Sequence, residues 1–336
     1  MNKRSGAGSH LRRICKVLVV GLTAGLLASF TMRSFAQEYP TRPVTIVVPF
    51  GAGGSADVYA RVIAQQLQLA LKQSFIVENR PGAGSIIGSQ FVAQSPADGY
   101  TLLLISNTHA VNETLFPKKK FKLMSDFVPV GPINSSDLVL VVNPKLGVNN
   151  VADLIKLAKS KPGGLSFASA GYGTPYHMAG ELFGEMAGIS LLHVPYKDSS
   201  QARTDVIGGQ VDMMFDATTT MEGFIRGGQV KALATTGDTR SHVLPNLPTV
   251  SEAGVPKYNA VIWLGLMAPK NTPQAVVDKL NAELAKIVAK PEIRAAWETQ
   301  GALPLTMSPS QFGQFLNGDI KKWADVVKVS GAKVDQ

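Results

Sequence analysis

A glycine-rich loop near the start of the chain has the residue types that bind an anion. Gly51, Gly53 and Gly54 follow an apolar run and precede Ser55, where a helix is expected to begin with Asp57 in its first turn. A strand that leads into a helix N-terminus leaves several backbone N–H groups unpaired, and the helix dipole adds partial positive charge there. The loop therefore predicts an anion site. It leaves open whether the anion is bound for chemistry or only carried.

A second loop, Gly171-Tyr-Gly-Thr174-Pro175, predicts another helix N-terminus, because Thr174 suits the N-cap and Pro175 the first helical position. His177 and Glu181 are four residues apart on this helix and could bind a metal ion, but no other ligand cluster completes such a site. A hydrogen-bonding or packing role is favoured for His177. Two helix ends that face each other would offer about four or five N–H donors, enough to bind an anion at micromolar affinity without arginine.

Other chemistry fits these motifs less well. Gly51-x-Gly53-x-x-Ala56 matches a loose dinucleotide fingerprint, with Glu78 at the end of the next strand, but Pro49-Phe50 and an export signal argue against it. No Gly-Lys-Ser/Thr follows, so the loop is not a P-loop. A packing turn without a ligand stays open. The chain has no Gly-x-Ser-x-Gly elbow, no His-Glu-x-x-His and no cysteine nucleophile, although a triad of scattered Ser and Asp residues stays open.

The first 36 residues have the pattern of a cleavable signal peptide. Basic residues precede the apolar run Val17–Phe30, and Ser34-Phe35-Ala36 forms a small-x-small cleavage site. The single cysteine, Cys15, lies within this segment, so the mature chain can form neither a disulfide nor a Cys–metal site. Removing the segment's six Lys and Arg residues lowers the formal net charge from +9 to +3. That charge favours small anions mildly and does not favour nucleic acid.

The elements that must position these loops alternate between strand and helix. Strands are expected at 44–48, 75–77, 100–106, 127–133, 138–143, 165–169, 191–194, 211–215, 230–235 and 260–268. Helices are expected at 55–71, about 86–94, 151–159, 175–186, 200–207, 221–226 and 291–299. Two more are expected to be capped by Thr272 and by Ser308, with Pro273 and Pro309 at their first helical positions. Asn107–Asn112 and the Lys118–Lys120 segment are expected to form one long loop. The pairs Gly208-Gly209 and Gly227-Gly228 are expected to mark helix-to-strand turns.

At 336 residues, the chain is long enough for about two domains. Two α/β units occur in tandem, and the C-terminal helices have no sheet of their own, so they are expected to cover the first sheet. The chain would then cross between two lobes near Leu138–Pro144 and near Ala260–Pro269, with a cleft between the lobes. The expected first lobe is 37–140 plus 264–336, and the second is 141–263.

Several longer runs resemble the Bug family, the extracytoplasmic solute receptors of tripartite tricarboxylate transporters, and they cover nearly all of the mature chain in order. They are Tyr39-Pro-x-Arg42-Pro-Val-x-Ile-Val-Val48, Pro49-Phe50-x-Ala52-Gly-Gly54-x-x-Asp57-x-x-Ala60-Arg61, Val77-Glu-Asn-Arg-Pro-Gly-Ala-Gly84, Ala97-Asp-Gly-Tyr-Thr-Leu-Leu103, His193-Val-Pro-Tyr-Lys197, Gly208-Gly-Gln-Val-Asp212 and Leu247-Pro-Thr-Val-x-Glu-Ala-Gly254.

The resemblance implies a fold, a function and a binding site. The fold would be α/β, a two-lobed periplasmic binding protein of type II, with two parallel-rich sheets flanked by helices and two crossover strands as a hinge. The protein would be a monomer without cofactor, metal or enzymatic activity that carries a small carboxylate through the periplasm to a membrane permease. Its ligand-binding residues would be Phe50, Ala52, Gly53, Gly54, Ser55, Asp57, Asn107, Thr108, Ser169, Gly173, Thr174, His177, Tyr196 and Asp216.

One position departs from the family pattern. Asp198 follows Tyr196-Lys197, where the family usually has glycine. If Asp198 faces the cleft, it would disfavour a second ligand carboxylate, and Tyr172 and Tyr176 could then favour an aromatic or amide-bearing acid. Two other functions stay open at this stage: a secreted α/β hydrolase or oxidoreductase acting on a small organic acid, and a receptor coupled to a signalling protein in place of a permease.

Overall fold

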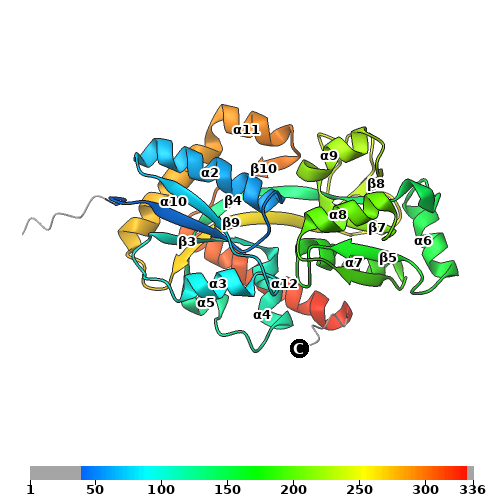
Figure 1. Cartoon of the computed structure of the whole chain (residues 1–336), viewed down its shortest axis with the longest axis horizontal. Helices are drawn as coiled ribbons and strands as arrows, with labels where there is room; N and C mark the ends of the chain where they lie inside the picture. The colour runs from blue at the N-terminus through cyan, green and yellow to red at the C-terminus, as the bar shows by residue number, and fades with distance from the viewer. Residues whose placement is uncertain (1–38, 331–336) are drawn as a thin grey trace, which may run out of the picture. The chain divides into compact units, whose positions relative to one another are not determined.

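The computed structural model describes residues 39–330, with side chains through 328. The predicted signal peptide lies outside the described residues. The chain divides after Thr41, and every helix and strand of the described residues belongs to the unit that begins at Arg42 (Figure 1). Among the described residues, no helix is long and apolar enough to cross a lipid bilayer.

Three parallel strands form one end of the sheet. β1 (Val44–Val48) lies between β2 (Phe75–Asn79) and β3 (Thr101–Ser106). The apolar residues of β1 and β3 are buried, as expected for strands with helices on both faces. Figure 1 shows α2 (Ser55–Leu71) on one side of these strands and α3 (Ile86–Ala93) on the other.

Two long antiparallel strands connect the halves of the sheet. The first part of β4 (Phe127–Val142) pairs with β9 (Val261–Pro269), and its last part, from Leu138, pairs with the second half. The prediction of two separate strands at 127–133 and 138–143 was wrong. The polar run Asn134–Asp137 continues the ladder because β9 and the short β10 (Ala302–Pro304) satisfy its backbone.

The second half repeats the α/β pattern. β7 (Met213–Ala217) and β8 (Lys231–Thr235) pair antiparallel with β4, and β5 (Ser166–Ser169) lies parallel between β7 and β6 (Leu192–Pro195). The two predicted glycine turns are confirmed. Gly209 ends α8 (Ser199–Gly208) at φ +82°, and Gly228 follows α9 (Thr218–Arg226) at φ +67°; glycine adopts these backbone conformations without strain.

The remaining helices flank this sheet. They are α4 (Asn107–Leu115), α5 (Leu123–Asp126), the 3-10 turn η1 (Pro144–Leu146), α6 (Val151–Ser160), α7 (Pro175–Ala187), α8 (Ser199–Gly208), α9 (Thr218–Arg226), α10 (Gln274–Ala289), α11 (Pro291–Glu298) and α12 (Pro309–Ser330). As expected, α10 and α12 return to the first half, where they pack against β4. The exact lobe boundaries stay predictions.

Two predictions about helix starts were wrong. The segment after β3 is not a loop, because α4 begins at Asn107 with a reciprocal cap: the Ser106 hydroxyl accepts from Thr108 N, and His109 Nδ1 accepts from Ser106 N at 3.1 Å. Thr272 does not cap α10; its hydroxyl donates to Pro269 O at 2.8 Å, and Pro273 occupies the N-cap. By contrast, Ser308 caps α12 as predicted, by accepting from Gln311 N.

A partly buried carboxylate connects α12 to the sheet. Asp319 Oδ2 accepts hydrogen bonds from two indole N–H groups, those of Trp263 in β9 at 2.9 Å and of Trp323 at 3.1 Å. Both tryptophan side chains are buried, and Trp263 also packs edge-on against Phe312. Burial raises the pKa of Asp319 even though both indoles donate to it. This cluster is a polar link between the last helix and a crossover strand.

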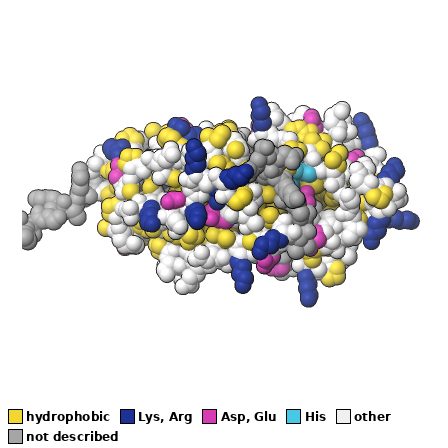
Figure 2. Space-filling model, turned by 90° about the horizontal axis from the view of Figure 1, so that it is seen from below, with side chains coloured by type: hydrophobic (Ala, Val, Ile, Leu, Met, Phe, Trp, Pro, Cys, Tyr) yellow, Lys and Arg dark blue, Asp and Glu magenta, His cyan; other side chains and the backbone are white. Residues whose placement is uncertain are grey.

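Charges on the surface are of both signs. Figure 2 shows one face of the molecule, on which Lys and Arg side chains are interspersed with acidic and apolar ones. Some basic side chains pair with acids at the surface, as Arg42 does with Asp98 at 2.8 Å and Arg240 with Glu252 at 2.9 Å. Exposed ion pairs of this kind contribute little to the stability of the fold.

Candidate functional site

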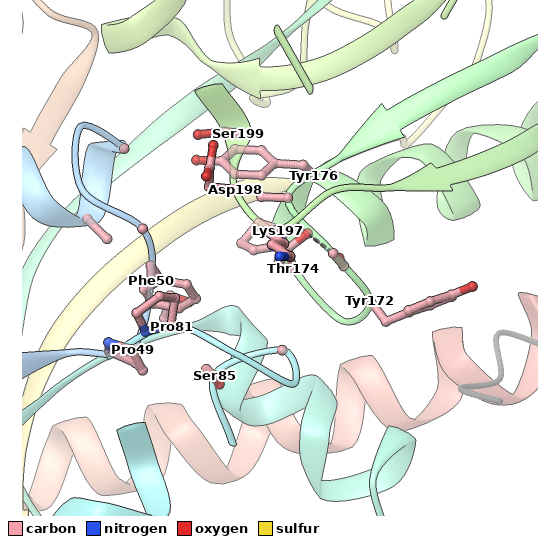
Figure 3. Close-up of a pocket in the computed structure, with 18 of the residues that line it drawn as sticks. Pro49, Phe50, Pro81, Ser85, Tyr172, Thr174, Tyr176, Lys197, Asp198 and Ser199 are labelled. Atoms are coloured by element: carbon pink, nitrogen blue, oxygen red, sulfur yellow. Dashed lines mark hydrogen bonds between the residues drawn. The ribbon is translucent and has the colours of Figure 1, made fainter. Parts of the chain in front are cut away.

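A cavity of about 600 Å³ lies between loops of the two halves of the sheet (Figure 3). The first half contributes the loop after β1, the loop before α3, and Ser106 at the end of β3. The second half contributes the loop after β5, which leads into α7, and the loop after β6, which leads into α8. Ile262 and Leu264 of β9 also line the cavity. The two glycine-rich loops picked out from the sequence therefore face one space.

The N-terminus of α2 has no side-chain cap. Gly54 occupies the N-cap position without a side-chain hydrogen bond, and both Gly54 and Ser55 line the cavity. Asp57, in the first turn of α2, holds the preceding loop in place. Its carboxylate accepts a hydrogen bond from Gly53 N at 3.0 Å and forms an ion pair with Arg61 at 2.9 Å. Burial acts to raise the pKa of Asp57, but the hydrogen bonds from Arg61 and Gly53 outweigh it and leave the pKa lowered.

The N-terminus of α7 is capped as predicted. Thr174 Oγ1 accepts from His177 N at 3.4 Å, and His177 Nδ1 accepts from Gly173 N at 3.1 Å. Since Nδ1 accepts, Nε2 carries the ring proton, and it lies 3.4 Å from Glu181 Oε1. His177 thus holds the loop in place by hydrogen bonding. No group of three or more His, Cys, Asp or Glu in the described part of the chain is placed to bind a metal ion.

An aromatic cluster lies behind this loop. The rings of His177 and His193 stack with centroids 4.0 Å apart, and Tyr172 contacts both rings edge-on. His193 Nε2 is 2.7 Å from Ser169 Oγ. Burial, together with the neighbouring His177, lowers the pKa of His193 to about 3. His193 therefore stays neutral at physiological pH, and the cluster supports Tyr172, which lines the cavity.

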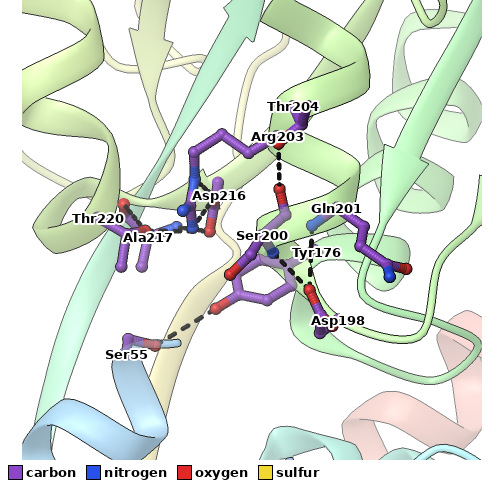
Figure 4. Close-up of polar contacts among 10 residues, drawn as sticks. All are labelled: Ser55, Tyr176, Asp198, Ser200, Gln201, Arg203, Thr204, Asp216, Ala217 and Thr220. Carbon is purple, nitrogen blue, oxygen red and sulfur yellow. Dashed lines mark hydrogen bonds and ion pairs between the residues drawn. The ribbon is translucent and has the colours of Figure 1, made fainter. Parts of the chain in front are cut away.

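The two halves touch on both sides of the cavity. Figure 4 shows Ser55 Oγ within 3.3 Å of the Tyr176 hydroxyl, which joins the start of α2 to the start of α7. Nearby, a Cβ atom added to Gly51 would lie only 2.8 Å from Asp198 Cβ. On the other side, a Cβ atom on Gly84 would lie 2.7 Å from Tyr172 O. Both glycines permit a close approach that any larger residue would hinder.

Five of the residues expected to bind ligand line the cavity: Phe50, Gly54, Ser55, Thr174 and Tyr196. The other nine lie around it. Ala52 and Gly53 lie in the loop that precedes α2 (Gly51–Gly54, the α2 loop), and Asp57 lies in the first turn of α2. Ser169 ends β5, Gly173 lies in the loop that precedes α7 (the α7 loop), and His177 lies in α7. Thr108 is fully buried in α4, and Asn107 bonds to Val261 O and Trp263 N of β9. Direct contact of these residues with ligand stays a prediction.

Asp216 is not part of the cavity lining and forms a buried ion pair. Arg203 Nε donates to Asp216 Oδ2 at 3.0 Å, and Ala217 N and the Thr220 hydroxyl bond to Oδ1 (Figure 4). The Asp216 side chain is fully buried. Burial raises its pKa while Arg203 opposes that rise. With both oxygens occupied, Asp216 serves to position the start of α9.

Sequence reasoning missed one wall of the cavity. Pro81, Gly82, Ala83, Gly84 and Ser85 line it, as do Phe116, Ser199, Ile262 and Leu264. A signal for the first group was present, because this proline- and glycine-rich run directly follows a strand and precedes a helix, as the α2 loop does. For Phe116, Ile262 and Leu264 no local signal exists, since an apolar residue on a cavity wall has the same pattern as one in the core.

The side chain of His109, at the start of α4, is expected to make the folded protein less stable in acid. It is buried, and burial lowers its pKa from 6.5 to about 3. The unfolded chain then binds the proton more tightly, so the free energy of unfolding should fall as the pH drops below about 6.5, by about 2 kcal/mol at pH 5. Urea unfolding at pH 7.5 and 5.0 measures this. His109→Gln can still accept from Ser106 N and should flatten the dependence; an unchanged pH dependence in this variant would contradict the assignment.

Comparison with known proteins gives one consistent result. A family model described as "Tripartite tricarboxylate transporter family receptor" matches residues 59–332. Protein BugT of Bordetella pertussis is 39% identical over 328 residues, which cover 97% of this chain and 99% of BugT. An R. palustris protein solved with adipate has a TM-score of 0.85 at 34% identity, covering 88% of this chain and all of that one. The periplasmic binding protein BugD has a TM-score of 0.83 at 35% identity, covering 88% and 99%, which confirms the predicted fold class.

Proposed function

Because the chain belongs to the family of tripartite tricarboxylate transporter receptors, we propose that it takes up a small carboxylate in the cavity and delivers it unchanged to membrane permease subunits. The signal-peptide pattern of residues 1–36 supports a periplasmic location for the mature protein. The neighbour solved with adipate supports a carboxylate as the ligand class. No observation on the described residues calls for a cofactor.

The uncapped N-terminus of α2 at the cavity wall carries this proposal. Backbone N–H groups at the start of a helix bind anions well, and here no side chain caps Gly54, while the Asp57 carboxylate accepts only from Gly53 N, before the N-cap. A hydrogen bond to a charged group contributes about 1.5–3 kcal/mol. Lys197 is the one cationic side chain among the described residues that line the cavity, and it is exposed at the rim. A carboxylate that enters would therefore gain both hydrogen bonds and charge complementarity.

A secreted hydrolase or oxidoreductase is the competing function, and the geometry does not favour it. The Ser169–His193 contact resembles part of a catalytic dyad, but the Ser169 side chain is fully buried and its hydroxyl also bonds to Gly171. A nucleophile must reach its substrate. We infer that this contact fastens β5 and the α7 loop.

A binding experiment separates the two functions. Saturation with the bound acid, at about 100 times its Kd, should stabilise the protein by about 2.7 kcal/mol. Thermal unfolding across a panel of organic acids measures the shift, and mass spectrometry of the protein as purified identifies acids that accompany it. The recovered acid should be chemically unchanged after incubation. Turnover of any bound acid would overturn the receptor assignment.

Substitutions in the α2 loop test where the anion binds. Asp57→Ala removes the acceptor that holds Gly53 N, and Gly53→Val places a branched side chain at φ +78°, where it is strained. Each should weaken carboxylate binding by about tenfold, because a loosened loop must be ordered again when the ligand binds. Isothermal titration measures the affinity, and circular dichroism checks that the variants fold. Unchanged affinity in both would place the site elsewhere.

Delivery to a permease requires a separate test in cells. Deleting the gene should abolish uptake of the radiolabelled acid that the protein binds, and expression of the wild-type chain should restore it. Persistent uptake at low external concentration would instead favour a role in signalling, since a receptor that only reports on a solute is dispensable for its entry.

A further inference from the structure

The N-terminal ends of five helices lie at the cavity wall. Gly54 and Ser55 belong to the start of α2, Ser85 to that of α3, Ser106 to that of α4, Thr174 and Pro175 to that of α7, and Asp198 and Ser199 to that of α8. Each start could in principle receive an anion, because its first N–H groups have no partner within the helix. The number of anions that the cavity accepts therefore depends on which starts the protein itself occupies.

Three starts are occupied by neutral groups of the protein. Ser106 and His109 accept the first N–H groups at α4, and Thr174 and His177 do so at α7. At α3 the loop folds back on itself: Ile86 N donates to Ala83 O at 3.2 Å and Ile87 N to Gly82 O at 3.5 Å. These acceptors satisfy the donors that an incoming carboxylate would need.

The fourth start is occupied by a charge. Asp198 is the N-cap of α8, and its Oδ1 accepts from Ser200 N at 2.9 Å and from Gln201 N at 3.0 Å (Figure 4). The protein's own carboxylate thus takes the place that a ligand carboxylate would take at this helix. Asp198 also lines the cavity, and Figure 3 shows it beside Ser199 and Tyr176. It therefore repels any second negative charge within the cavity.

Among these five starts, only α2 has neither a capping side chain at its N-cap nor a folded-back carbonyl on its first N–H groups; the Asp57 carboxylate accepts from Gly53 N alone. Its N-cap is glycine, which has no side chain to act as an acceptor, and Ser55 Oγ is directed to the Tyr176 hydroxyl instead of to the backbone. The described residues of the cavity lining include one positive side chain, Lys197, and one negative side chain, Asp198. A singly charged ligand can be matched by α2 with Lys197, whereas a second ligand charge would be desolvated without a partner.

Much of the remaining wall is apolar. Pro49, Phe50, Pro81, Phe116, Ile262 and Leu264 line this space. Burying an apolar ligand body against such a wall contributes about 25 cal/mol for each Å² removed from water. The wall provides few donors for a second carboxylate and suits an aliphatic chain or an aromatic ring.

We propose that the ligand carries a single carboxylate on an uncharged, largely apolar body, and that Asp198 is the residue that excludes diacids and triacids. This inference rests on the proposed function, since it concerns the ligand of the same cavity. It assigns to Asp198 two effects that can be separated: it occupies the N–H groups of α8, and it adds a negative charge to the cavity.

Matched acids test the proposal directly. Hexanoate and adipate have the same number of carbons and differ in one carboxylate, and benzoate and isophthalate form the corresponding aromatic pair. In titration calorimetry with the mature protein, the monoacid of at least one pair should bind at least about tenfold more tightly than its diacid. Equal or tighter binding of the diacid in both pairs would overturn the inference and leave the proposed function intact. Binding of none of the four acids would count against the proposed function as well.

Two substitutions separate the effects of Asp198. Asp198→Asn keeps an oxygen that accepts from Ser200 N and Gln201 N but removes the charge, and should raise the diacid-to-monoacid affinity ratio by about threefold. Asp198→Gly also frees these N–H groups and should raise the ratio by about tenfold. Asp153→Asn is the matched control: Asp153 Oδ2 accepts from Asn149 N at the start of α6, outside the cavity lining, so the ratio should not change. An unchanged ratio in Asp198→Gly would overturn the role of Asp198.

Discussion

Gly51→Ala is expected to weaken carboxylate binding by about thirtyfold while the protein stays folded. The new Cβ would lie 2.8 Å from Asp198 Cβ, about 1 Å closer than carbon atoms normally pack. The loop after β1 and the start of α8 would have to separate, which opens one side of the cavity. Overpacking of this kind costs about 2 kcal/mol, and that cost corresponds to the expected change in Kd. Titration calorimetry with the acid that binds the wild type measures it.

Two further variants make this test specific. Gly223→Ala is the matched control, because a Cβ atom added at this position would have no neighbouring atom within 4 Å, and Ala is favoured over Gly inside α9. It should leave the affinity unchanged. Asp198→Gly removes the atom that Gly51→Ala would meet, so the double variant should recover the affinity of Asp198→Gly alone. If Gly51→Ala bound the acid as tightly as the wild type, contact between these two loops would not matter for binding.

Asp319→Ala is expected to lower the free energy of unfolding by about 3 kcal/mol. The substitution leaves the indole N–H groups of Trp263 and Trp323 without an acceptor in a buried place, and each unsatisfied donor costs about 1–3 kcal/mol. Part of that cost is offset, because the substitution also removes a carboxylate whose charged form burial disfavours. The raised pKa of Asp319 reflects this effect of burial. Urea unfolding followed by tryptophan fluorescence reports on this cluster directly.

The controls for this prediction lie at the same position and on the same helix. Asp319→Asn keeps an oxygen acceptor for both indoles and should lose less than about half as much stability. Asp325→Ala removes an exposed acid of α12 and should change stability by less than about 0.5 kcal/mol. A small effect of Asp319→Ala, similar to that of Asp325→Ala, would show that the two hydrogen bonds contribute little to holding α12 on the sheet.

Much of the fold could be predicted from local patterns. The continuous apolar runs of β1 and β3, the glycine turns after α8 and α9, and the Thr174-Pro175 start of α7 all appear where expected. These features depend on neighbours within a few residues, which is why sequence alone predicts them. The errors occurred where distant contacts decide. Asn134–Asp137 has the composition of a turn, yet it is strand because β9 and β10 pair with it.

The candidate site likewise has some features that local sequence predicts and others that only the tertiary structure sets. The sequence by itself determined that two helix starts fed by glycine loops would be present, since the residue types at Gly51–Asp57 and Gly171–Pro175 permit little else. Only the tertiary structure brought these helix starts to one cavity, because the loops that line it come from segments far apart in the chain. It also placed the Asp198 carboxylate, which caps α8, at the cavity wall. Capacity for an anion and the cap at each helix start are local chemistry; that these starts share one cavity depends on contacts between segments far apart in the chain.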